Sequence, residues 1–314
     1  MNQQPLVSVV IPVYNAEQFL GEALESVLAQ TYEPIEVIAV NDGSTDGSED
    51  VLNKFSGRVK CFRQKNGGEG SARNLGIAHA SGEWIAFQDA DDLWDPNKLE
   101  MQLSAASDQD DVIHTDMRRI DDSGHVLLES WNSTRDIVHA PATLLDMLVG
   151  CGVLMSTAVV RRRALENVGG FDGTNRWRCV DFELWLCLAA TGHGFRYVDK
   201  PLASYRLHDS NWSLDRKIMH RGEIYALRQT YQRYRRRFGK REATICHNRL
   251  WNYDFGQGWH LYNKGDYDAA GKHFWAAVRH KPFVLRPWVL ASLCSLPFRS
   301  RLVPVLRAMK GRTP

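Results

Sequence analysis

Hydrophobic runs alternate with amphipathic stretches through the first 95 residues. Leu6–Val13 is continuous and β-branched, which is typical of a strand buried on both faces, and Ile35–Val40 repeats that pattern. Between them, Glu17–Gln30 places apolar residues at helical spacing. The same reasoning predicts, in order, a helix at 48–55, a strand at 59–62, a helix at 71–80 and a strand at 84–87. This alternation predicts a parallel sheet with helices on both faces.

Polar loops follow three of these strands, where parallel sheets bind ligands. They begin at Tyr14, at Asp42 and at Asp89. The third loop holds three carboxylates, Asp89, Asp91 and Asp92, which resist burial together and suit a hard divalent cation. A solvated acidic turn before a helix is the alternative. Asp95-Pro96 indicates such a helix over 96–106, with Asp95 as its N-cap.

The second half of the chain differs from the first in charge. Residues 1–200 contain 17 Lys and Arg against 30 Asp and Glu, whereas residues 201–314 contain 22 against 7. The basic part points to an anionic partner. The six cysteines lack any zinc-site spacing and indicate a reduced, cytoplasmic protein. No apolar run approaches the roughly 18–20 residues that span a bilayer, and no signal peptide is evident, so we expect a soluble or peripheral protein.

Seven motifs in order resemble those of the family-two inverting glycosyltransferases of the GT-A fold. They are SVVIPVYN (8–15), VNDGSTDGS (40–48), NGGEGSARNLGIAHASGEWIAF (66–87), QDADD (88–92), GGFD (169–172), VDFELWLCLAATG (180–192) and YRLH (205–208). The resemblance covers about the first two-thirds of the chain. It implies an α/β fold with a GT-A-type, mostly parallel sheet flanked by helices, followed by an α-helical C-terminal region.

The resemblance implies a nucleotide-sugar donor, UDP-linked in our interpretation, held at the loops named above. Tyr14 would stack on the base beside Pro12, and Asp42 would accept a hydrogen bond from the base edge. A capping aromatic and an Asx turn are the alternatives for these two side chains. The resemblance places Asp89 and Asp91 at the ribose and the diphosphate. Arg73 would approach the diphosphate, or else form a salt bridge with a neighbouring carboxylate.

A divalent metal, Mn²⁺ or Mg²⁺, is the cofactor that the resemblance implies. Asp91, Asp92 and His208 are its candidate ligands, and whether Asp91 or Asp92 is the main one stays open. A structural histidine is the alternative for His208.

Asp181 is the candidate general base. It lies at the start of Phe182–Ala190, which is apolar nearly all round and predicts a buried helix. The family usually has Glu-Asp here, whereas this chain has Val180-Asp181. A plain N-cap is the alternative.

The function implied is metal-dependent transfer of a sugar, with inversion, to an acceptor hydroxyl. The acceptor would be a glycan or a lipid-linked glycan in cell-surface polysaccharide synthesis. Two other functions remain open. One is a nucleotidyltransferase that acts on sugar phosphates, and the other is a non-catalytic nucleotide-sugar-binding or scaffold protein.

We predict a glycosyltransferase domain at 1–212, divided into a nucleotide-sugar-binding half (1–95) and an acceptor half (96–212). The predicted elements of the acceptor half are a strand at 111–117, a loop at 130–139, short helices at 141–149 and 161–168 around a strand at 157–160, and a turn at 169–172.

Residues 213–314 predict a helical, basic region. One tetratricopeptide-like hairpin is expected at about 251–284, with Asp254 where that pattern has tryptophan. Residues 282–314 mix apolar and basic side chains, which favours either docking on an anionic membrane at the inner face of the cell or packing as a terminal subdomain. No nucleic-acid-binding motif accompanies the basic stretch at 215–241, so we expect no nucleic-acid partner.

Overall fold

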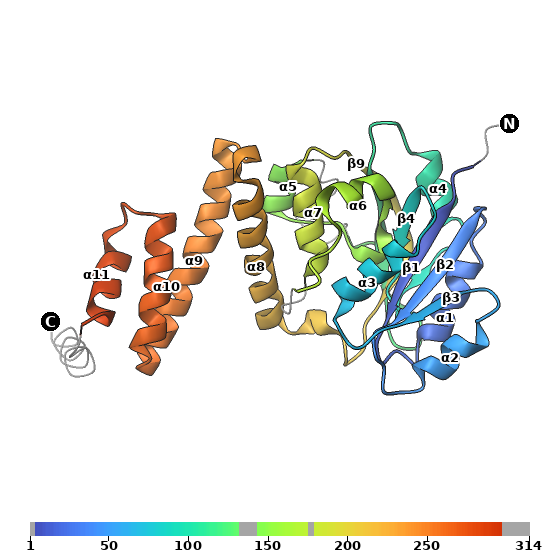
Figure 1. Cartoon of the computed structure of the whole chain (residues 1–314), viewed down its shortest axis with the longest axis horizontal. Helices are drawn as coiled ribbons and strands as arrows, with labels where there is room; N and C mark the ends of the chain where they lie inside the picture. Colours follow the sequence, from blue (N-terminus) through green and yellow to red (C-terminus); the bar gives the residue numbers. More distant parts are fainter. Residues whose placement is uncertain (1–3, 132–142, 175–178, 297–314) are drawn as a thin grey trace. The chain divides into compact units, whose positions relative to one another are not determined.

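The computed structural model describes residues 4–131, 143–174 and 179–296 of the 314. The chain forms two compact units, Met1–Arg237 and Phe238–Pro314 (Figure 1). The strands of the first unit are β1 (Val7–Val13), β2 (Ile35–Asn41), β3 (Lys60–Arg63), β4 (Trp84–Phe87), β5 (Leu93–Trp94), β6 (Val112–Ile120), β7 (Val126–Leu128), β8 (Val159–Arg161) and β9 (Phe195–Arg206). Its helices are α1 (Leu20–Leu28), α2 (Ser48–Lys54), α3 (Glu69–Ala78), α4 (Lys98–Ser104), α5 (Leu144–Val149), α6 (Arg162–Val168), α7 (Val180–Ala190) and α8 (Arg216–Tyr234).

Within the described part of the chain, all nine strands belong to one sheet, in the order β3-β2-β1-β4-β8-β6-β9-β5, with β7 paired to β6. The first four strands pair in parallel, as the alternating pattern predicted. Strand β8 is antiparallel to both β4 and β6, whereas β6 and β9 are parallel. The α/β class with flanking helices is therefore confirmed, and the sheet is mixed in the half that follows β4.

Strand β1 is buried on both faces of the sheet, which explains why the first predicted run is continuously apolar. Its odd-numbered residues, from Val7 to Val13, join α1 in one buried cluster. On the other face, Val10 meets α3 at Gly76, where an added Cβ would lie 2.4 Å from a methyl carbon of Val10. The close approach of α3 to the sheet therefore depends on the missing side chain at position 76.

The predicted helix start at Asp95 is wrong. Helix α4 begins at Lys98, with Asn97 at the N-cap position. The Asp95 carboxylate instead pairs with both terminal nitrogens of Arg118, at 2.7 and 3.0 Å. A bidentate pair with arginine outweighs a cap on a seven-residue helix, because it makes two charge-assisted hydrogen bonds. The predicted loop at 130–139 falls largely outside the described residues, as do the first two residues of the helix predicted at 141–149.

The second unit consists of α9 (Lys240–Lys264), α10 (Tyr267–His280) and α11 (Leu285–Cys294). Helices α9 and α10 form a hairpin that turns at Gly265, whose φ of 86° favours glycine. An added Cβ at Gly258 would lie 2.8 Å from the ring of Phe274, so the two helices are in close contact there. Asp254 is fully buried between the same helices and pairs with His273 at 3.1 Å and His280 at 3.5 Å.

Within the described residues, no helix has both the length and the apolar character needed to cross a lipid bilayer.

Candidate active site

The candidate residues gather at the carboxyl ends of the parallel strands. Val13, the last residue of β1, pairs with Asn41, the last residue of β2. Strand β4 lies on the other side of β1 and ends at Phe87, opposite Val10. The loops that carry Tyr14, Asp42 and Asp89–Asp92 therefore open on one edge of the sheet, as the sequence predicted.

Asp42 anchors the glycine-rich loop that leads into α3. Its buried carboxylate accepts hydrogen bonds from the backbone N–H groups of Gly67 and Gly68, both at 2.8 Å, and from Gln64 at 2.7 Å. Gly68 has a φ of 86°, which the turn into α3 requires. Tyr14 leaves the end of β1 with 44% of its surface exposed, which makes its ring available for stacking.

Arg73 is the cation at the centre of the site. Its buried guanidinium contacts Asp89 at 2.6 Å and Glu69 at 3.5 Å, and lies over the ring of Phe171 at 5.5 Å. The salt bridge that the sequence left as an alternative is therefore present. Burial raises the pKa of the partly exposed Asp89, although Arg73 opposes that shift.

Asp91 and His208 come together from positions 117 residues apart, with Asp91 Oδ2 at 3.0 Å from His208 Nε2. The other ring nitrogen of His208, Nδ1, is 2.7 Å from the Ser210 hydroxyl. Both side chains are partly exposed at the edge of the sheet. This pair offers one carboxylate and one imidazole, which suit Mn²⁺.

Asp92 lies on the inner side of the same loop. It is buried, and its two oxygens accept hydrogen bonds from the Ser156 hydroxyl at 2.6 Å and from the Arg206 backbone N–H at 3.1 Å. Burial, and then the charges of Asp91 and Asp89, raise the pKa of Asp92 well above its usual range. Both oxygens are therefore engaged in tying the loop to the turn before β8 and to the end of β9, which leaves Asp91 better placed for a metal.

No group of three or more His, Cys, Asp or Glu side chains is arranged to hold a metal ion among the residues that the structure describes. Asp91 and His208 by themselves form a two-ligand pair. Protein sites for Mg²⁺ commonly supply one or two ligands, with the remainder coming from substrate phosphates and water. The residues present therefore fit a metal that binds together with a nucleoside diphosphate.

Asp181 is the second residue of α7, one position inside a helix whose N-cap is Cys179. The partly buried carboxylate accepts a hydrogen bond from the N–H of Phe182 at 2.7 Å. Burial, followed by the charge of Glu69, raises the pKa of Asp181 to about 6. Arg73 and Asp89 are also within electrostatic reach of this carboxyl group. Asp181 is thus a more basic carboxylate than an ordinary aspartate, and it lies near Arg73 and Asp89 at the carboxyl ends of the strands.

Three residues of this site were not identified from the sequence: Glu69, Ser156 and Arg206. The spacing of Glu69 and Arg73, four residues apart, indicated a helical ion pair and was available as a signal. Arg206 stands within the YRLH motif, and its guanidinium donates to the Asp91 backbone carbonyl at 3.0 Å and pairs with Glu22 at 2.7 Å. Nothing local in the sequence marks Ser156.

Solved structures of low sequence identity share the fold. S. aureus TarS 1–349, solved in complex with UDP-GlcNAc, superposes with a TM-score of 0.66 over 91% of this chain and 88% of that one, at 19% identity. The mannosyltransferase PcManGT from Pyrobaculum calidifontis, solved with GDP-Man and Mn²⁺, superposes with a TM-score of 0.60 over 100% of this chain and 82% of that one, at 18% identity. The fold is that of the GT-A glycosyltransferases.

Sequence similarity gives the family. The family model described as glycosyl transferase family 2 matches residues 8–169. The putative teichuronic acid biosynthesis glycosyltransferase TuaG of Bacillus subtilis is 31% identical over 223 residues, which are 68% of this chain and 83% of that protein. The chain belongs to glycosyl transferase family 2.

The extent of similarity varies among the relatives. An uncharacterized glycosyltransferase of Rickettsia typhi is 31% identical over 214 residues, 66% of this chain and 65% of that protein. Another, from Rickettsia bellii, is 48% identical over 130 residues, which are 40% of this chain and 19% of that protein. The chain therefore spans less than two-thirds of the length of these two relatives.

Proposed function

We propose that this glycosyltransferase moves a sugar from a nucleoside diphosphate, UDP in our proposal, to an acceptor hydroxyl with inversion at the anomeric carbon. The observation that carries the proposal is Asp181, a partly buried carboxylate with a pKa of about 6 within electrostatic reach of the Arg73–Asp89 pair. An unusually basic carboxylate beside a nucleotide-binding edge suits a general base in a single displacement.

The donor would lie along the edge formed by β1, β2 and β4. We assign the base to Tyr14 and Asp42, beside Pro12, and the ribose and diphosphate to Asp89 and Asp91. Binding of UDP-GlcNAc by TarS, which has the same fold, supports this assignment. Arg73 already has anionic partners, and a diphosphate would compete for it with Asp89.

Asp91 and His208 would hold the metal, Mn²⁺ or Mg²⁺, with the donor diphosphate completing the set. When bound, the metal neutralises charge on the departing diphosphate. Asp92 is the weaker candidate ligand, because both of its oxygens already accept hydrogen bonds. The Mn²⁺ in the PcManGT complex supports this part of the proposal.

Asp181 would take the proton of the acceptor hydroxyl as that oxygen attacks the anomeric carbon. The bond between this carbon and the diphosphate oxygen breaks, and its electron pair leaves with the nucleoside diphosphate. With a pKa of about 6, the carboxylate is largely ionised near neutral pH and still more basic than an ordinary aspartate. One displacement of this kind inverts the configuration, through an oxocarbenium-like transition state.

We place the acceptor among glycans or lipid-linked glycans of cell-surface polysaccharide synthesis, at the cytoplasmic side of the membrane. The similarity to TuaG, described as a putative enzyme of teichuronic acid biosynthesis, supports this class of acceptor. The six cysteines are all free thiols, which suits a reducing compartment.

The test is to incubate the protein with a panel of nucleotide sugars and Mn²⁺ and to identify the nucleotide product. Release of UDP with a new glycoside of opposite anomeric configuration is expected. Pyrophosphate release would instead indicate nucleotidyl transfer, and the absence of any turnover would indicate a binding or scaffold protein.

Metal dependence is tested with Asp91→Ala and with excess EDTA. Each is expected to abolish turnover and to weaken metal-dependent nucleotide binding. Asp50→Ala, which removes an exposed carboxylate on α2, is the matched control and should behave as wild type. Full activity in EDTA would contradict the metal assignment.

A further inference from the structure

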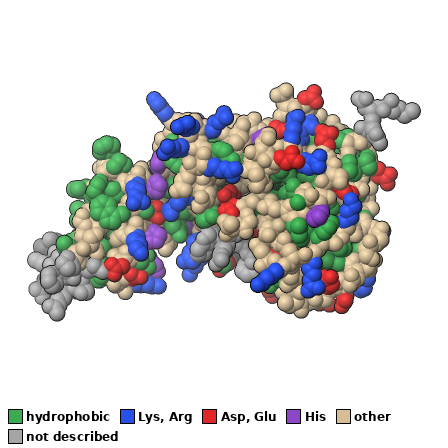
Figure 2. All heavy atoms as spheres, viewed as in Figure 1, with side chains coloured by type: hydrophobic (Ala, Val, Ile, Leu, Met, Phe, Trp, Pro, Cys, Tyr) green, Lys and Arg blue, Asp and Glu red, His purple; other side chains and the backbone are tan. Residues whose placement is uncertain are grey.

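One short stretch of the second unit concentrates exposed apolar surface. Among the described residues, eleven large hydrophobic side chains are exposed, and five of them lie between residues 283 and 296. The two most exposed of all are Phe283 at 99% and Leu285 at 73%, in the turn before α11 and at the start of that helix. Figure 2 shows hydrophobic side chains gathered on the lobe formed by α9, α10 and α11. Isolated exposed apolar residues need no explanation, whereas a cluster of this kind indicates a binding surface.

The exposed apolar residues of this stretch fall on one face. Leu285, Trp288 and Val289 of α11, with Leu296 just after its end, follow helical spacing. Together with Ser292 and Leu293, the last three line a shallow hollow on that face. The opposite face, with Pro287, Ala291 and Cys294, is buried. The helix is therefore packed on one side and exposed on the other.

Trp288 is held rigidly at this surface. Its indole N–H donates to the Pro282 carbonyl at 2.7 Å, and its ring meets Trp275 edge to face at 5.2 Å. The ring nevertheless remains 39% exposed. An amphipathic ring fixed at a surface is typical of the boundary between water and lipid.

The charge near this face is mainly basic. Residues 269–296 contain four Lys and Arg and no Asp or Glu. Two of these cations lie near the start of α11. Lys281, in the connection before the helix, is over the ring of Trp251 at 4.7 Å, and Arg286, the second residue of the helix, is over that of Trp259 at 5.1 Å. A surface that is apolar and mainly basic complements an anionic, partly apolar partner.

We propose that the exposed face of α11, with the turn from Phe283 to Leu285, docks on an anionic lipid surface. A second copy of this chain fits less well, because it would bring the same excess of cations to the interface. Lipid satisfies both features at once, since acyl chains accept Phe283 and Leu285 while anionic headgroups face Lys281 and Arg286. This inference concerns a surface of the second unit and does not depend on the catalytic proposal.

The experiment is flotation of the full chain with vesicles of phosphatidylcholine and phosphatidylglycerol, and with vesicles of phosphatidylcholine alone. The test variant is Phe283→Ser/Leu285→Ser. The matched control is Val126→Ser/Leu127→Ser, which removes two exposed apolar side chains from β7 of the first unit. All these side chains are exposed, so thermal melting should be unchanged in both variants.

Wild type and the control are expected to float with the anionic vesicles, and less so as salt is raised. The test variant should bind them about tenfold or more weakly, because two apolar side chains lose their burial in lipid. Wild-type protein that never floats, or equal flotation of the test variant, would overturn the proposal. Concentration-dependent dimers that the test variant abolishes would assign this face to a second copy instead.

Discussion

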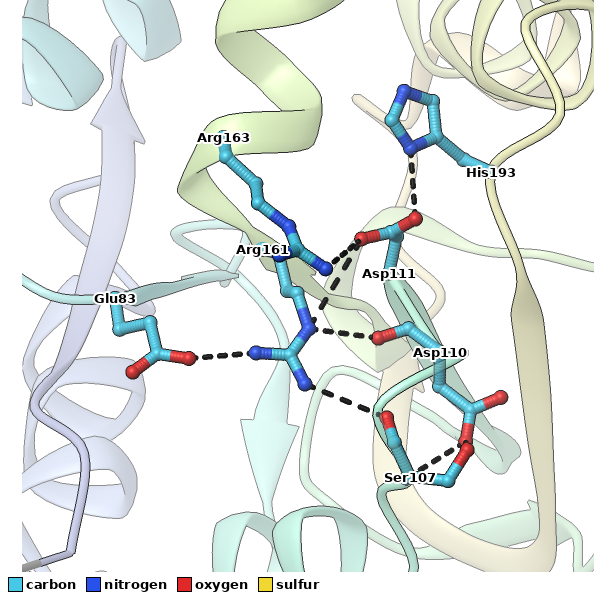
Figure 3. A network of polar contacts seen from close by, with 7 residues as sticks. All are labelled: Glu83, Ser107, Asp110, Asp111, Arg161, Arg163 and His193. Carbon is cyan, nitrogen blue, oxygen red and sulfur yellow. Dashed lines mark hydrogen bonds and ion pairs between the residues drawn. The ribbon is translucent and has the colours of Figure 1, made fainter.

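Two clusters of charged side chains lie at opposite ends of the same strands, and they are built differently. At the end where β4 and β6 begin, Arg161 donates to the carbonyls of Asp110 and Ser107, at 2.9 and 3.4 Å, and pairs with Glu83 at 2.6 Å (Figure 3). At the end where β1, β2 and β4 finish, the carboxylates of the candidate active site surround Arg73.

Charges in the Arg161 network are balanced. Asp111 contacts Arg163 at 3.3 Å and His193 at 2.8 Å, as Figure 3 also shows. Although burial opposes it, hydrogen bonds from Ser107 and Arg196 hold the pKa of Asp110 below its usual range. Asp110 therefore contributes stability above its unfolded pKa that is lost as the pH falls through the lowered value.

The site cluster has more acids than bases. Burial raises the pKa values of Asp89, Asp92 and Asp181, which means that folding disfavours their ionised forms. Arg73 is the cation that Asp89 and Glu69 share. The comparison indicates that one end of the sheet is arranged for stability, and that the other end accepts a cost in stability for chemistry.

The largest expected effect is that of Asp181→Asn on the transfer rate. The amide keeps the size of the side chain but cannot take a proton, so the rate should fall by about 10²–10⁴. Donor affinity should be largely retained, because none of the proposed donor contacts is made by Asp181. Rate and donor affinity are measured together, with Asp108→Asn at an exposed loop position as the control. Transfer at a near wild-type rate would remove Asp181 from the role of base.

Arg161→Met is expected to lower stability and to leave the transfer rate unchanged, which is the reverse of the effect on rate expected of Asp181→Asn. Methionine keeps most of the packing on the Trp84 ring, over which Arg161 lies at 4.3 Å, but two backbone carbonyls lose a donor. Stability should fall by about 2–3 kcal/mol, with the transfer rate unchanged well below the melting temperature. Chemical unfolding measures this loss. Arg58→Met, at an exposed pair with Glu25, is the control and should leave the melting temperature unchanged. A loss of activity without a loss of stability would contradict the claim that the Arg161 end of the sheet is arranged for stability.

The smallest expected effect is a shift in the pH profile. The proposed base, Asp181, must be ionised to accept a proton, so the rate should rise with pH through its pKa of about 6. Glu69→Gln removes the negative charge that, after burial, most raises this pKa, so the acidic limb should move to lower pH. The profile of kcat/KM against pH gives the answer. An unmoved limb would show that Glu69 does not act on Asp181.

The sequence predicted the first half of the fold better than the second. Buried parallel strands are continuous apolar runs, so β1, β2 and β4 were visible at once, and strand β4 was placed at its observed bounds. The pairing of β6 with β8 and β9 depends on partners far along the chain, and no local pattern encodes it. Arg161 and its partners, spread from Glu83 to His193, were missed for the same reason.

For the site, strand ends and motif order predicted the carboxylate loops. Asp91 and His208, which the sequence grouped as candidate ligands, are in contact at 3.0 Å, and their role as ligands stays a prediction. The sequence could not separate Asp91 from Asp92. That distinction depends on which carboxylate turns inward to Ser156 and Arg206, and those partners lie 64 and 114 residues away. The contribution of Glu69 to the environment of Asp181 likewise depends on how close α3 and α7 come to each other.

The central claim is that the carboxylates of the site are kept at a cost in stability. The most direct test is the free energy of unfolding of wild type and Asp181→Asn, from urea titrations near pH 8 and near pH 4. The pKa of Asp181 is about 6 in the folded protein, whereas that of an aspartate in the unfolded chain is about 4. Between these two values the native protein binds more protons than the unfolded chain, so its stability falls as the pH rises through about 6. The variant should therefore be more stable by about 2 kcal/mol near pH 8, with the difference closing near pH 4. A variant that is less stable near pH 8, or a difference that does not change with pH, would contradict the claim.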